Sequence, residues 1–170
     1  MITMTAPFTA RKAARRADNT PRPPCVLAVA SGGGHWVQLM RLRPAFAGAE
    51  VHFATVDRSV AGAVAPAPVH VYPDANKDTP LRLVFAALKL ALIVLRVRPD
   101  VVVSTGAAGG YLAIRFARLI GARTMFIDSI ANARDLSVSA RLAQKAADLV
   151  LSQWPAVARA TGAAYRGAVL

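Results

Sequence analysis

Two glycine-rich stretches contain the residues best suited to bind an anion. The first, Ser31-Gly32-Gly33-Gly34-His35, follows a short apolar run at 26–30 and precedes apolar residues with helical spacing. Glycine has no Cβ, so a ligand can come close to the main-chain N–H groups that begin a helix, where negative charge is favoured. His35 suits proton transfer or contact with an anion, because imidazole changes charge near neutral pH. The stretch predicts a phosphate-binding turn, and a tight turn without a ligand is the alternative.

The spacing of these glycines matches neither of two well-known nucleotide motifs. The dinucleotide fingerprint requires G-x-G-x-x-G and the P-loop requires G-x-x-x-x-G-K-[ST], and residues 31–35 fit neither. Asp57, directly after the second expected strand, would support a dinucleotide site, because an acidic side chain there can bond to a ribose hydroxyl. An aspartate in this place also caps strands or helices. An NAD(P)-binding Rossmann oxidoreductase therefore stays as an alternative function.

The second glycine-rich stretch, 105–110, follows the apolar run 101–104, which is typical of a central parallel strand. Turns at the carboxyl ends of neighbouring parallel strands lie side by side, and ligands of open parallel sheets bind at that edge. We therefore expect one diphosphate to contact both turns. The expected contacts are Ser31, Gly32, Gly33, Gly34, Ser104, Thr105, Gly106, Gly109 and Gly110.

A polar loop after the expected strand 123–127 reaches the same edge of the sheet. It contains four candidate site residues, Asp128, Ser129, Asn132 and Arg134. These side chains would line the site, or the loop only connects the strand to a helix that begins near Ser137, which is a suitable N-cap residue.

Alternating apolar segments predict the elements that position these turns. Strands are expected at 26–30, 51–56, 69–72, 101–104, 123–127, 147–152 and 164–169, and helices at 35–46, 81–97, 111–120, from 137 and after 155, with 60–68 irregular. This alternation predicts an α/β fold with a doubly wound, Rossmann-like parallel sheet. Residues 1–24 are expected to form a flexible basic tail, and 25–170 a single domain.

The expected helix at 81–97 is mostly apolar. Its three cations, Arg82, Lys89 and Arg96, recur every seven residues and form one narrow stripe. At roughly 25 Å the helix is too short to span a bilayer comfortably. We expect its outer flank, including Phe85 and Leu92, to meet acyl chains or a partner while the cations reach lipid phosphates. The alternative is a buried helix with one solvent-facing ridge.

The charge and cysteine content limit the possible partners and cofactors. A formal net charge of +12 favours an anionic partner. A nucleic-acid-binding module is a weaker alternative, because aromatic residues are not interleaved with the basic ones. The single cysteine, Cys25, excludes an intramolecular disulfide and any Cys-based zinc site. With one glutamate, Glu50, and scattered aspartates, no magnesium site is expected, so we expect neither a metal nor another cofactor.

Several short motifs, in order, carry a resemblance to a known family. They are Ser31-Gly-Gly-Gly-His35 with Leu39-Met40-Arg41-Leu42, then Ser104-Thr105-Gly106, Ile127-Asp128-Ser129, Ala147-Asp148-Leu149 and Gln153-Trp154-Pro155. Over about residues 25–170 the chain resembles the membrane-associated subunit of the bipartite N-acetylglucosaminyltransferase of dolichol-linked oligosaccharide synthesis. It also resembles that subunit's bacterial relatives in exopolysaccharide and capsule synthesis.

This resemblance implies the N-terminal half of a GT-B glycosyltransferase, peripheral on the cytoplasmic face of the membrane. Such a chain holds a polyprenyl-diphosphate-linked acceptor, while a separate donor-binding chain holds the UDP-sugar, carrying N-acetylglucosamine or glucuronic acid, so this chain alone is expected to be inactive. His35 matches the family's histidine, for which a base or a diphosphate contact is implied. Asp128 stands where relatives commonly have glutamate, and Asn132 where many have arginine.

Overall fold

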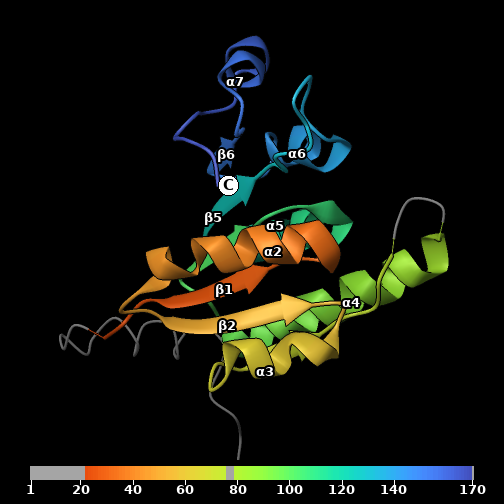
Figure 1. Ribbon diagram of the computed structural model, residues 1–170. Helices are drawn as coiled ribbons and strands as arrows, with labels where there is room; N and C mark the ends of the chain where they lie inside the picture. The colour runs from red at the N-terminus through yellow and green to blue at the C-terminus, as the bar shows by residue number, and fades with distance from the viewer. Residues whose placement is uncertain (1–21, 76–78, 170) are drawn as a thin grey trace, which may run out of the picture.

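The computed structural model describes residues 22–75 and 79–169 and shows a parallel sheet covered by helices (Figure 1). Its strands follow the order β3-β2-β1-β4-β5-β6, and every neighbouring pair is parallel. This doubly wound order confirms the Rossmann-like fold class predicted from the sequence. The strands are β1 (Cys25–Val29), β2 (Glu50–Thr55), β3 (Val69–Val71), β4 (Val101–Ser104), β5 (Arg123–Ile127) and β6 (Leu149–Leu151).

Helices cover both faces of the sheet. Their bounds are α2 (Gly33–Leu42), α3 (Ala61–Val64), α4 (Pro80–Val97), α5 (Ala107–Leu119), α6 (Val138–Ala143) and α7 (Pro155–Thr161), with 3-10 turns η1 (Arg43–Phe46) and η2 (Arg58–Val60). Figure 1 shows α2 and α4 on opposite sides of β1 and β2. All five residues of β1 are buried, as expected for the strand at the centre of the sheet.

The alternation of side chains along β1 divides the core into two layers. Leu27 and Val29 pack with residues of α4 and α5, while Ala28 packs with Trp36 of α2 and Phe53 of β2. The Trp36 and Phe53 rings meet edge to face, with their centroids 5.7 Å apart. Both layers hold β1 in place, and β1 positions the first glycine-rich turn.

Three local predictions differ from the structure. Residues 164–169 form no strand, and only an isolated bridge joins Ala164 to Leu151. The segment expected to be irregular, 60–68, contains α3. The helix predicted at 111–120 is α5, which begins at Ala107, four residues earlier than predicted, so Gly109 and Gly110 lie inside it. Glycine usually weakens a helix, but tertiary contacts override that preference here.

The predicted basic tail lies mostly outside the described residues. Its described end, 22–24, leads into β1, and the guanidinium of Arg22 lies 3.1 Å from the carboxylate of Asp100. The same carboxylate accepts a hydrogen bond from the main-chain N–H of Cys25. These contacts fix the start of β1, while the division into tail and domain stays a prediction.

Candidate functional site

The two glycine-rich turns lie next to each other at the carboxyl edge of the sheet. β1 pairs with β4 so that Val29 is opposite Ser104. We call residues 31–35 the first corner and residues 104–110 the second corner. The prediction that they are neighbours on one edge is confirmed, and this edge, between β1 and β4, is where ligands of such sheets bind.

Two reciprocal hydrogen bonds join the corners. The Nδ1 atom of His35 lies 2.9 Å from the carbonyl oxygen of Thr105, and the Thr105 hydroxyl donates to the carbonyl oxygen of His35 at 2.7 Å. A carbonyl oxygen only accepts, so Nδ1 carries the proton. In the neutral ring Nε2 then has the lone pair. The contact between the corners therefore leaves His35 with Nε2 as its basic nitrogen.

The first helical residue of each corner has the same unusual backbone conformation. The first residue of α2, Gly33, has φ 60°, and the first residue of α5, Ala107, has φ 63°. Neither helix receives a side-chain hydrogen bond at its N-cap, which is Gly32 for α2 and Gly106 for α5. Glycine adopts this left-handed conformation readily, whereas for alanine it costs about 1–2 kcal/mol. Uncapped N-terminal N–H groups are the groups that bind anions.

The first corner is open. A Cβ atom added to Gly33 or Gly34 would meet no atom within 4 Å, and both residues are exposed. Ser31 and Gly32 are half-buried. The main chain of the first corner is therefore accessible to a ligand.

The second corner is packed. A Cβ at Gly106 would lie 2.3 Å from Nδ1 of His35, one at Gly109 would lie 2.6 Å from the Tyr72 ring, and one at Gly110 would lie 1.9 Å from Oγ of Ser104. All three glycines are buried. They allow close packing of the protein against itself, which is a different use of glycine from that at the first corner.

The hydroxyl groups of the second corner are used inside the protein. Ser104 and Thr105 are fully buried. The Ser104 hydroxyl accepts from the main-chain N–H of Gly106 at 3.2 Å, while Thr105 bonds to the first corner. Of the nine predicted diphosphate contacts, the five from the second corner are thus placed within the protein, and those from 31–34 face outward or lie at the edge.

A cavity of about 280 Å³ lies beside His35. Ser129 and Asn132, from the loop after β5, line it together with Ala107. The structure therefore brings three of the predicted site residues together around one space. Arg134 is exposed and does not line this cavity.

Asp128 holds the loop in place. It is buried, one carboxylate oxygen accepts from the Asn132 amide at 2.9 Å, and the other accepts from the main-chain N–H of Ser137 at 2.9 Å. Its carbonyl oxygen accepts from Gln153 at 2.8 Å. With both oxygens bonded inside the loop, Asp128 supports the cavity wall.

The sequence reasoning missed several polar residues of this wall. Ser137 and Ser139 line the cavity, and the Ser137 hydroxyl caps α6 by accepting from the N–H of Ala140, as predicted for the cap. Buried Gln38 and Gln153 both donate to the Asp128 carbonyl. Gln38 lies one turn after His35 on α2, and this spacing was the signal available in the sequence.

Tyr72 is a further missed residue beside the corners. It is buried, its ring packs on Gly109, and among the described residues its hydroxyl has no hydrogen-bond partner. Burial raises the pKa of the Tyr72 phenol, with a smaller contribution from the charge of Asp74. The Tyr72 hydroxyl therefore stays protonated at neutral pH.

Asp57 acts as a cap. Its carboxylate accepts from the main-chain N–H of Ser59 at 2.8 Å at the start of η2, and hydrogen bonds from Ser59 lower the pKa of Asp57. The carboxylate that would support a dinucleotide site is therefore already used in local structure.

The outer face of α4 is apolar and exposed. Exposed fractions reach 76% at Leu81 and 63% at Phe85, and this face is formed by Leu81, Val84, Phe85, Leu88, Leu92 and Leu95. Arg82, Lys89 and Arg96 are exposed beside it. The helix is therefore not buried with a single solvent-facing ridge. Among residues 22–75 and 79–169, no helix combines the length and apolar character needed to cross a bilayer.

Comparison with solved structures finds chains of similar fold at low sequence identity. The chain is similar to MurG from Acinetobacter baumannii (TM-score 0.65, 15% identity), and the match covers 78% of this chain and 42% of that one. It is also similar to UDP-N-acetylglucosamine 2-epimerase from Rickettsia bellii (TM-score 0.66, 11% identity), with 87% of this chain covering 46% of that one. The chain thus spans less than half the length of these proteins. Their likeness confirms a fold of the kind found in the N-terminal half of GT-B glycosyltransferases.

A family model described as "Oligosaccharide biosynthesis protein Alg14 like" matches residues 74–169, more than half of the chain. The comparison with curated proteins found no match. The matched range includes α4, the second corner and the loop around Asp128. The chain therefore belongs to the Alg14-like family of oligosaccharide biosynthesis proteins.

Proposed function

We propose that this chain is the acceptor-binding subunit of a two-chain glycosyltransferase. The acceptor is a sugar linked to a polyprenyl or dolichyl diphosphate, and the donor is a UDP-sugar held by a second chain. The observation that carries the proposal is His35, which bridges two uncapped helix N-termini and lines a cavity of about 280 Å³. The family and the fold support the same class of reaction.

The open first corner is the binding site for the acceptor diphosphate. Gly33 and Gly34 leave the first N–H groups of α2 uncovered, and the helix dipole favours an anion there. The second corner acts indirectly, because Thr105 and Gly106 hold the His35 ring against the first corner. The nine residues predicted as contacts thus divide into a binding group at 31–34 and a supporting group at 104–110.

His35 is the general base of the proposed reaction. With Nδ1–H donated to Thr105, Nε2 accepts the proton of the acceptor hydroxyl as that oxygen attacks the anomeric carbon of the donor sugar. UDP leaves with the electron pair of the broken glycosidic bond. Ser129 and Asn132, which line the same cavity, orient the acceptor sugar by hydrogen bonds in this proposal.

The exposed face of α4 gives the subunit its place at the membrane. A contiguous apolar strip on an exposed face marks an interaction site, and Arg82, Lys89 and Arg96 beside it suit anionic headgroups. We expect Leu88→Asp with Leu92→Asp to abolish sedimentation with anionic vesicles. Asp substitutions at exposed Leu119 and Val138 are the matched control, and sedimentation that stays unchanged in the α4 variant contradicts this part of the proposal.

Co-expression with the donor-binding chain tests the function. Membranes containing both chains are given radiolabelled UDP-N-acetylglucosamine or UDP-glucuronic acid and a polyprenyl-diphosphate-linked sugar, and labelled lipid is extracted and counted. We expect transfer only when both chains are present, and the two donors identify the sugar. His35→Gln should reduce transfer by about 10²–10⁴-fold, the usual contribution of a general base.

Asp57→Asn is the matched control for this experiment, because Asp57 is exposed and only caps η2. It should transfer sugar at the wild-type rate. Full transfer by this chain alone, or by His35→Gln in the complex, contradicts the proposal. The NAD(P)-dependent alternative keeps no specific support, since the Asp57 carboxylate is committed to Ser59.

A further inference from the structure

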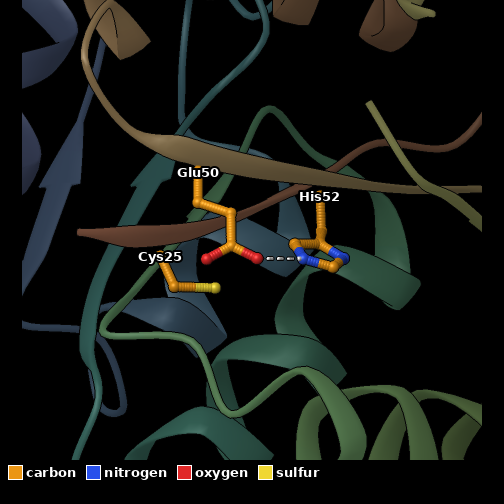
Figure 2. Close-up of side chains that lie close together, drawn as sticks. All are labelled: Cys25, Glu50 and His52. Carbon is orange, nitrogen blue, oxygen red and sulfur yellow. Dashed lines mark hydrogen bonds and ion pairs between the residues drawn. The ribbon is translucent and has the colours of Figure 1, made fainter. Parts of the chain in front are cut away.

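Three side chains with metal-binding atoms converge at the edge of the sheet opposite the glycine corners. Cys25 is the first residue of β1, Glu50 is the first residue of β2, and the two are register partners. His52 follows two positions later on β2 and therefore faces the same side of the sheet. The thiol sulfur, a carboxylate oxygen and a ring nitrogen all lie within 4.8 Å of one another (Figure 2).

The spacing of the Glu50 and His52 atoms fits two ligands of one tetrahedral ion. In zinc sites the metal lies about 2.0–2.1 Å from nitrogen and oxygen ligands, which places two such ligands about 3.3 Å apart. Oε1 of Glu50 lies 3.3 Å from Nε2 of His52. Figure 2 shows the Glu50 carboxylate between the thiol and the imidazole. The Glu50 side chain is 64% exposed, so it is free to adjust and leaves the ion a path from solvent.

His70 provides the outer support that metal-bound histidines usually have. Its Nε2 lies 3.0 Å from Nδ1 of His52, and the two rings stack with their centroids 5.3 Å apart. When His52 donates Nδ1–H to His70, the lone pair on Nε2 points toward the Glu50 carboxylate. In this tautomer Nε2 of His52 offers a metal ion its lone pair, and a second-shell hydrogen bond of this kind fixes the ring for coordination.

The donor set favours zinc over magnesium or calcium. Sulfur and imidazole nitrogen suit zinc, whereas magnesium and calcium prefer oxygen ligands. A thiolate and a carboxylate together balance the charge of Zn²⁺, so the loaded site itself carries no net charge. A neutral site is favourable here because nearby cations would repel added positive charge. Lys89, Arg96 and Arg58 line a cavity of about 380 Å³ together with His70.

We propose that Cys25, Glu50 and His52 bind one zinc ion, with the fourth position open to water. The ion joins the starts of β1 and β2, and binding releases the thiol proton to solvent. This revises two expectations from the sequence, that the chain holds no metal and that its single cysteine excludes a Cys-based zinc site. Glu50 and His52 lie 25 and 27 positions after Cys25 along the chain, so only the pairing of β1 with β2 brings them to the cysteine.

Cobalt binding to the untagged full-length chain tests the proposal. The protein is stripped with a chelator and titrated with Co²⁺, which binds zinc sites and absorbs light. We expect one equivalent to produce a near-ultraviolet band from a thiolate–cobalt bond and visible bands typical of tetrahedral cobalt. One equivalent of Zn²⁺ should remove both sets of bands, and it should raise the melting temperature of the metal-free protein.

Variants identify the ligands. Cys25→Ser should remove the thiolate band. For His70→Gln we expect zinc affinity to fall by about 10–100-fold. Glu50→Gln and His52→Gln should each lower zinc affinity by more than that. Matched controls are His35→Gln and Asp57→Asn, at the other edge of the sheet, which should bind zinc as the wild type does. Circular dichroism of the metal-free variants checks that each is folded.

The result that overturns the proposal is wild-type protein without a thiolate band, or Cys25→Ser, in folded form, with unchanged zinc affinity. Equal losses in the His35→Gln and His52→Gln proteins would also overturn it, because they would assign the metal to histidines in general. Sugar transfer plays no part in these measurements, so their outcome is independent of the proposed function.

Discussion

The two glycine corners begin their helices in the same backbone conformation but have opposite surroundings. Each follows a central strand, and each starts a helix with a residue near φ +60°. At the first corner, the space that a Cβ would occupy is open at Gly33 and Gly34, whereas at the second corner it is filled by His35, Tyr72 and Ser104. A glycine-rich turn thus has two distinct uses, and substitution by alanine separates them.

Gly106→Ala should have the largest effect. The new methyl group would collide with the His35 ring, and the residue has φ 140°, which alanine rarely adopts. We expect a loss of about 3 kcal/mol in the free energy of unfolding, measured by urea denaturation, and loss of sugar transfer in the complex. Stability within about 0.5 kcal/mol of wild type would show that the corners are not packed together as described.

Gly110→Ala should destabilise the chain by about 2 kcal/mol, because its methyl group would overlap the buried Ser104 hydroxyl. Removing that hydroxyl makes room, so the double variant Ser104→Ala with Gly110→Ala should recover part of the loss. Urea unfolding of both single variants and the double variant gives the coupling energy. Purely additive effects would contradict the contact.

Gly34→Ala should separate stability from function. No atom lies near the added methyl group, and alanine favours a helix over glycine, so the free energy of unfolding should rise by about 0.5–1 kcal/mol. The same methyl group covers the main chain that binds the diphosphate, so the KM for the lipid acceptor should increase. A stable variant with an unchanged KM would remove Gly34 from the binding site.

Ala107→Gly should have the smallest effect. It relieves the left-handed conformation of an alanine, but glycine loses more backbone freedom on folding, and the two contributions leave a gain of about 0.5 kcal/mol. Thermal unfolding measures this gain. A loss of stability would mean that the alanine methyl group makes contacts that outweigh its backbone strain.

The sequence was sufficient to predict the fold and the meeting of the two corners. Continuous apolar runs such as 101–104 marked the central strands, and glycine marked the turns that follow them. The sequence predicts the same role for both turns, however, because composition does not show whether the space beside a glycine is empty or filled by another side chain. Only the packed structure distinguishes open Gly34 from buried Gly110.

Polar side chains were harder to assign than backbone elements. Asp128 follows a strand at the functional edge, which made it a candidate for the site, yet its oxygens serve Asn132 and Ser137. The orientation of a loop carboxylate depends on which N–H groups the chain brings near it. The same holds for Cys25 and His52, whose proximity depends on strand register.

The bond from His35 to the Thr105 carbonyl has a consequence for turnover in the proposed reaction. Because a carbonyl oxygen has no proton to exchange, the His35 imidazole gains and loses protons through Nε2 only. The bond to Thr105 therefore offers no path for a proton into the protein interior. A proton taken from the acceptor must therefore leave from Nε2 as well. His35 becomes a base again only after the product has moved away and water or buffer reaches the ring.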